Sequence, residues 1–165
     1  MSKTRRLTVL ALCVALCLVL SYLELLLPPL SAAVPGIKPG LANILIVFVL
    51  YRMGVRDAAA VSFLRLVLSA LLFGSVLSLA YSAAGACLSL TGMALLRRTD
   101  RFSPVGVSVC GGVLHNAGQI LVAAWLMRTA AIGYYMIVLA VTGTVSGVLV
   151  GLAGALLLRY TKRLK

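Results

Sequence analysis

One arginine lies in the middle of an apolar segment, and it is the residue of this sequence most suited to binding chemistry. Arg65 belongs to the run SFLRLVLS at residues 62–69. It lies about 12 Å from either end of its segment at a helical rise of about 1.5 Å per residue. A charged side chain at that depth in a membrane is costly and usually faces a polar cavity. Arg65 is therefore a candidate ligand-binding residue. The alternative is a structural arginine bonded to carbonyls or to Glu24.

A second polar cluster occurs in the run GGVLHNAGQ at residues 111–119. His115 and Gln119 are four residues apart and share a helical face, with Asn116 beside them. Three polar side chains within an apolar segment need partners. The glycines around them permit close approach by another helix or by a ligand. We expect these three side chains to line a binding site, and the alternative is hydrogen bonding between helices.

The loop PPLSAAVPGIKPG at residues 28–40 contributes two further candidates. Its prolines and glycines prevent a regular helix, and irregular backbone near a membrane is tolerated where it lines a cavity. Lys38 is the single charge in this loop, and Asn43 follows it closely. Both are candidate ligand-binding residues. The alternative is a plain exterior turn.

The composition indicates which elements must position these side chains. Hydrophobic residues make up 62% of the 165-residue chain and the mean hydropathy is +1.13. A soluble chain of this length cannot bury so much apolar surface, so we expect one all-α transmembrane domain over residues 1–165. The net charge of +12 lies in short clusters between apolar runs. That pattern favours a bilayer surface over nucleic acid as the partner.

Six apolar segments are predicted from length and from Pro and Gly boundaries. They are Leu7–Leu27, Leu41–Tyr51, Asp57–Phe73, Val76–Leu96, Pro104–Met127 and Tyr135–Tyr160. A spanning helix needs about 20 apolar residues. The second segment therefore spans only if the preceding loop continues the helix or the membrane is thin there. The first segment is longer than a signal-peptide core, so we expect it to remain as a helix.

Basic residues then set the orientation. In a six-helix chain, twelve of the fifteen Lys and Arg fall on one side, two (Lys38 and Arg128) on the other, and Arg65 within the membrane. Because cytoplasmic loops carry the excess of Lys and Arg, we expect a multi-pass protein of a bacterial cell membrane with both termini cytoplasmic. The twelve are Lys3, Arg5, Arg6, Arg52, Arg56, Arg97, Arg98, Arg101, Arg159, Lys162, Arg163 and Lys165.

The remaining motifs are those of helix packing. Gly143, Gly147 and Gly151 form GxxxGxxxG, and Ser78, Ser82 and Ala86 repeat the same spacing, which lets helices approach closely. Ala11 and Ala15 form AxxxA on an otherwise Leu-rich helix and are candidates for docking a partner protein. The four cysteines lie in apolar segments without CxxC or a nearby His. No metal, disulfide or cofactor is expected.

Three motifs together carry a family resemblance. PGIKPGLANI, FLRLVLSALLFGS and GGVLHNAGQI, in this order, resemble the bacterial Gx transporter family, also described as heptaprenyl diphosphate synthase component I. That family resembles the S components of energy-coupling factor (ECF) transporters. The resemblance implies six helices, capture of a small molecule, and a coupling membrane protein with ATPase subunits that contacts AxxxA on the first helix. Pro39 stands where the resemblance places an aliphatic residue.

The acidic residues of the chain distinguish the two functions. A prenyl synthase catalytic subunit needs clustered carboxylates to hold Mg²⁺, and the three acids here, Glu24, Asp57 and Asp100, are more than thirty residues apart. We therefore expect no enzyme, but an S-component-like subunit that binds an anionic or carbonyl-rich ligand. A flavin, a quinone precursor or an isoprenoid phosphate fits that description. The alternative is a non-catalytic membrane subunit of heptaprenyl diphosphate synthase in isoprenoid and menaquinone biosynthesis.

Overall fold

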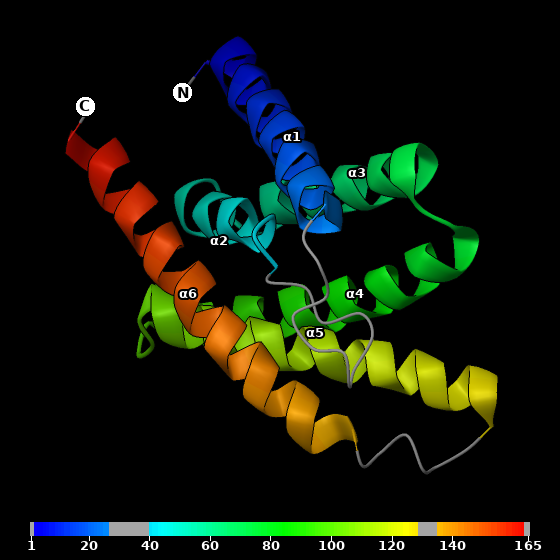
Figure 1. Ribbon diagram of the computed structural model, residues 1–165. Helices are drawn as coiled ribbons and strands as arrows, with labels where there is room; N and C mark the ends of the chain where they lie inside the picture. The colour runs from blue at the N-terminus through cyan, green and yellow to red at the C-terminus, as the bar shows by residue number, and fades with distance from the viewer. Residues whose placement is uncertain (1, 27–39, 129–134, 164–165) are drawn as a thin grey trace.

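Six α-helices make up nearly all of the chain that the structure describes. The structure is a computed structural model and describes residues 2–26, 40–128 and 135–163, where no strand occurs. The all-α prediction is confirmed, and six helices lie in these residues (Figure 1). The helices are α1 (Lys3–Leu26), α2 (Asn43–Arg52), α3 (Val55–Phe73), α4 (Val76–Arg98), α5 (Pro104–Met127) and α6 (Tyr135–Arg163).

The helix boundaries follow from capping chemistry. Ser75 and Ser103 cap α4 and α5, where their hydroxyl oxygens accept hydrogen bonds from the N–H groups of Ser78 at 3.1 Å and Gly106 at 3.2 Å. These bonds satisfy backbone donors that have no partner within the helix. Gly54 separates α2 from α3 at φ +109°, a conformation that glycine adopts without strain. The boundaries of the last four segments therefore lie close to those predicted from the sequence.

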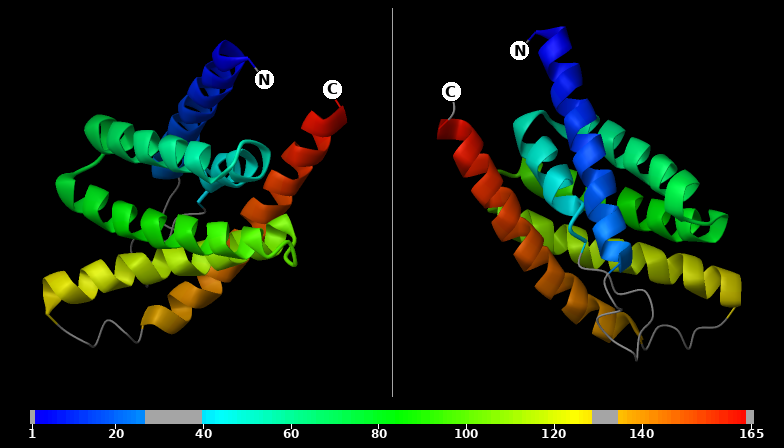
Figure 2. Two further views of the ribbon diagram at one scale, coloured as in Figure 1. Left: turned by 180° about the vertical axis from the view of Figure 1, so that it is seen from behind. Right: turned by 45° about the horizontal axis from the view of Figure 1, so that its top comes forward.

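Three helices form a stack that the others cross. Helices α3, α4 and α5 lie one above the next, and α6 runs obliquely beside α5 (Figures 1 and 2). Helix α1 packs on α3 and α2, and both ends of the chain lie at the same side of the molecule (Figure 2). This arrangement brings all six helices around one central region.

Helices α5 and α6 pack with their backbones in contact. A Cβ atom added to Gly147 would lie 2.6 Å from the Cα of Val109, and one added to Gly151 would lie 2.7 Å from the Cα of Val105. Only hydrogen fits in such a space, so the GxxxGxxxG stripe of α6 serves packing within the chain, as predicted.

The Gly147→Ala variant should therefore lose stability, by about 1–3 kcal/mol, the usual cost of overpacking. Gly106→Ala is the matched control, because an added Cβ there meets no atom closer than 3.8 Å. Thermal unfolding of the two purified variants in detergent measures the difference. Equal unfolding temperatures would contradict the backbone contact.

Helix α2 is short and forms the centre of the core. It has ten residues, and every side chain from Leu45 to Leu50 is buried. It packs against α1, α3, α5 and α6. At about 1.5 Å per residue it covers about 15 Å, half the hydrocarbon thickness, so it does not cross a membrane by itself.

Four helices, α1, α4, α5 and α6, are long and apolar enough to cross a membrane. Helix α3 has 19 residues, a sufficient length, but Arg56, Asp57 and Arg65 lie within it. The protein is thus a helical membrane protein, with α2 and α3 differing from simple spans.

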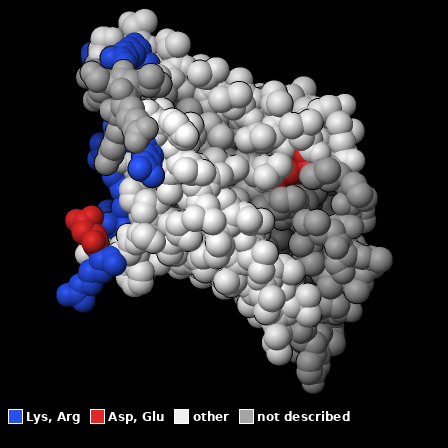
Figure 3. Space-filling view, turned by 60° about the vertical axis from the view of Figure 1, so that its left-hand side comes forward, with Lys and Arg blue, Asp and Glu red and all other residues white. Residues whose placement is uncertain are grey.

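The charged ends of several helices meet on one side. Arg6 of α1 forms an ion pair with Asp57 of α3 at 2.5 Å. Arg97 of α4 lies over the ring of Tyr51 at the end of α2, 5.4 Å from its centroid. In the space-filling view, Lys and Arg gather along one edge of the visible face and the rest is largely uncharged (Figure 3). This agrees with a membrane protein whose basic loops share one side.

Candidate functional site

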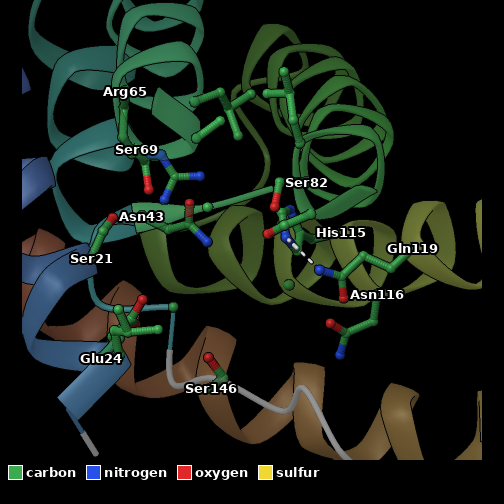
Figure 4. Close-up of a pocket in the computed structure, with 18 of the residues that line it drawn as sticks. Ser21, Glu24, Asn43, Arg65, Ser69, Ser82, His115, Asn116, Gln119 and Ser146 are labelled. Carbon is green, nitrogen blue, oxygen red and sulfur yellow. Dashed lines mark hydrogen bonds between the residues drawn. The ribbon is translucent and has the colours of Figure 1, made fainter. Parts of the chain in front are cut away.

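A polar cavity of about 190 Å³ lies where the six helices meet. All six described helices contribute residues to its wall. Figure 4 shows ten of its polar side chains, which point toward a shared space. The polar lining residues are Ser21, Glu24, Asn43, Arg65, Ser69, Ser78, Ser82, His115, Asn116, Gln119, Thr142 and Ser146.

Arg65 is the cation of the described cavity wall. Its guanidinium extends from α3 toward the cavity, next to Ser69 one turn further on (Figure 4). Its Nε is buried and has no hydrogen-bond partner. A buried donor without a partner costs free energy, more so when it is charged. The described fold thus leaves this donor of Arg65 unsatisfied.

Glu24 lies on the opposite wall and is held by the backbone. Its side chain is 7% exposed, and its carboxylate accepts a hydrogen bond from the N–H of Leu41, just before α2. Gly40 begins this turn at φ +72°. A Cβ there would lie 3.2 Å from Nδ2 of Asn43 and 3.4 Å from Oγ of Ser146, so a side chain at position 40 would narrow the cavity.

The His115 cluster forms the third wall. The ring Nε2 of His115 lies 3.4 Å from Nε2 of Gln119, one turn apart on α5. Asn116 donates a hydrogen bond from Nδ2 to the backbone oxygen of Leu139 on α6, at 2.7 Å. Gly85 of α4 makes room for the imidazole, because a Cβ there would lie 2.9 Å from its Nδ1. Ser82, from the same helix, faces this cluster (Figure 4).

The structure brings together five of the six side chains predicted to bind ligand: Asn43, Arg65, His115, Asn116 and Gln119. Lys38 lies outside the described residues. That these side chains bind ligand stays a prediction. For Asn116 the alternative role, hydrogen bonding between helices, is also present, because its amide bonds to α6.

Sequence reasoning missed several polar lining residues. Ser78 and Ser82 were interpreted as packing residues, but they line the cavity, as do Ser21 and Ser146. A signal existed for Ser21, which is three residues before Glu24 and therefore shares its helical face. Serines are common in membrane helices as packing residues, so their type alone did not separate the two roles.

The predicted docking pair lies on the outer face of α1. Ala11 and Ala15 are exposed, whereas Cys13 and Cys17, each two positions further on, are buried. A shift of two residues places a side chain on the opposite face of a helix. The pair therefore lies on a surface that contacts lipid or another protein.

The described wall of the cavity offers one cation, several hydrogen-bond donors and acceptors, and a carboxylate already engaged by backbone. The other two acids lie elsewhere: Asp57 pairs with Arg6, and Asp100 follows the end of α4. This arrangement suits recognition of a small polar molecule. A magnesium-dependent reaction would require carboxylates gathered at one point.

Comparison with known proteins gives a family match and no individual relative. Residues 13–157 match the family model described as heptaprenyl diphosphate synthase component I. No curated protein matches the chain. No solved structure matches it either. The matched range includes every described residue that lines the cavity.

Proposed function

Because the chain belongs to the heptaprenyl diphosphate synthase component I family, we propose that it is a non-catalytic membrane subunit of that synthase and binds a small polar molecule in its cavity. The observation that carries the binding role is Arg65, a buried cation that faces the cavity without a hydrogen bond at Nε. Intramembrane charges without partners typically mark binding sites.

The non-catalytic role follows from the acids of the chain. Prenyl-chain synthesis requires Mg²⁺ bound against a diphosphate, and the ligands for Mg²⁺ are carboxylates. This sequence has three acids in total, separated by more than thirty residues. The subunit would thus supply a membrane site and a partner surface, and another protein would supply the catalytic carboxylates.

A second candidate is a substrate-binding subunit of an energy-coupled transporter. The cavity favours it, because a polar site enclosed by all six helices is what a captured solute requires. The exposed Ala11 and Ala15 pair would then dock a coupling membrane protein that is driven by ATPases. The two proposals share the cavity and differ in the partner.

Affinity purification from native membranes separates the two. Under the first proposal the chain co-purifies with a soluble prenyl transferase, and adding the purified chain in lipid vesicles raises prenyl-chain synthesis by that enzyme. Under the second it co-purifies with a membrane coupling protein and ATPases, and vesicles take up solute when ATP is hydrolysed. Purification without a transferase, together with unchanged synthesis, would refute the first proposal.

A further inference from the structure

Arg65 gives the cavity a specificity that the family assignment does not state. We propose that the cavity binds a small organic acid with a single carboxylate, which the guanidinium of Arg65 holds. This proposal rests on the binding role proposed above and names the class of ligand. It starts from two observations: the guanidinium of Arg65 faces the cavity, and its buried Nε–H has no hydrogen-bond partner within the fold.

The guanidinium of Arg65 indicates the shape of the ligand group. Its N–H groups form planar forks that match the two oxygens of a carboxylate. Ser69 lies beside the guanidinium, and the amide of Asn43 points toward it (Figure 4). A planar carboxylate placed in the cavity would pair with the guanidinium and receive further hydrogen bonds from neutral side chains.

The charges of the described cavity wall favour a ligand with a small negative charge over one with a large negative charge. Among the described lining residues Arg65 is the cation and Glu24 the acid, so their formal charges cancel. A phosphate monoester carries about −1.5 to −2 at neutral pH, and a diphosphate carries more. That excess would lie near the carboxylate of Glu24, and like charges held close together in a protein cost free energy. A monocarboxylate adds the smallest charge that still pairs with Arg65.

The wall formed by the His115 cluster indicates which polar groups the rest of the ligand has. His115 and Gln119 lie together there, and both have groups that donate and accept hydrogen bonds. Asn116 uses its amide nitrogen on α6, which leaves its carbonyl oxygen as an acceptor. These groups suit hydroxyl or carbonyl substituents on the acid.

The size of the cavity favours a small ligand. Its volume of about 190 Å³ is below the range of about 300–1,000 Å³ that is typical of sites for drug-sized ligands. Among the ligands expected from the sequence, a small quinone precursor agrees best with this volume.

The test compares acids with their neutral amides. The full-length protein, purified in detergent, is titrated with lactate, benzoate and 4-hydroxybenzoate and with the three corresponding amides, and binding is measured by calorimetry. Inorganic phosphate and pyrophosphate test for phosphate ligands. Oleate tests whether a lipid supplies the carboxylate. We expect at least one short acid to bind about ten- to hundredfold more tightly than its amide, the range for a hydrogen bond to a charged group.

The same titrations on variants assign the preference to Arg65. In Arg65→Gln the acid and its amide should bind equally. Arg65→Lys keeps the charge without the planar fork, so it should retain only part of the affinity difference between an acid and its amide. This variant replaces Arg65→Gln in the test if Arg65→Gln does not fold. Ser62→Ala is the control, because Ser62 is buried on the same helix and does not line the cavity. It should leave the acid preference unchanged.

Four results would overturn the proposal. They are equal binding of every acid and its amide, absence of any binding in the panel, tighter binding of phosphate, pyrophosphate or oleate than of every short acid, and an acid preference that survives Arg65→Gln. These outcomes are independent of the partner experiment. Loss of acid binding with the transferase still attached removes only this proposal, and acid binding without the transferase removes only the synthase assignment.

Discussion

The Arg65→Met variant is expected to unfold at a higher temperature than the wild type when no ligand is present. A charge near the centre of a membrane helix costs about 2.5–3.5 kcal/mol, and Met fills a similar volume without charge. Regaining about 2 kcal/mol would raise the unfolding temperature by about 4–8 °C in a domain of this size. The same variant should lose the acid preference, so stability and binding should change in opposite directions.

The matched control is Leu66→Met, the neighbouring cavity-lining residue, where an apolar side chain replaces another. Its unfolding temperature should change little. Thermal unfolding followed by intrinsic fluorescence in one detergent compares the three proteins. An unfolding temperature for Arg65→Met below that of the wild type would show that Arg65 holds the fold together, which was the alternative raised from the sequence.

The second large effect is expected on the outer face of α1. Replacing Ala11 and Ala15 together by Leu should reduce recovery of the partner protein by at least tenfold. Bulk at positions that permit close helix contact separates the helices, and interhelical packing in membranes depends on that contact. Binding of the acids should remain, because both side chains point away from the cavity. Co-purification and calorimetry on the same preparation measure the two properties.

The control pair lies on another helix. Ala83 and Cys87 of α4 are exposed and four residues apart, like the α1 pair. Replacing them together by Leu adds comparable bulk to a different lipid-facing surface. If both double variants retain the partner, α1 is not the docking helix. If both lose it, the effect is not specific to AxxxA.

The sequence predicted the helices and five of the polar residues that line the cavity, because each of these depends on local chemistry. Arg65 and the pair His115 and Gln119 were identifiable, since polar side chains in apolar segments are conspicuous wherever the helices go. Proline and glycine residues marked several helix ends for the same reason. The residue types and their positions along the chain were enough to predict these features.

Other features depend on the tertiary fold. Nothing in the sequence showed that Glu24 and Arg65 would line one cavity while Asp57 pairs with Arg6, because those relations arise when α1 packs on α3. The stripe of Ser78 and Ser82 has the spacing of a packing motif, and only the position of α4 beside the cavity gives it a polar role. The cavity volume, which narrows the ligand class, has no counterpart in the sequence.

The short helix α2 has a consequence for how the protein is made. Its residues from Ile44 to Leu50 are apolar on every side, and the helix packs against α1, α3, α5 and α6. A segment that spans half the bilayer cannot insert stably alone, and in the native protein its buried faces meet protein rather than lipid. Because α6 is synthesised after α2, α2 reaches its final surroundings only once α6 is in place. The wall at Asn43 is therefore completed late, and a chain truncated before α6 would lack both a closed core and a complete cavity.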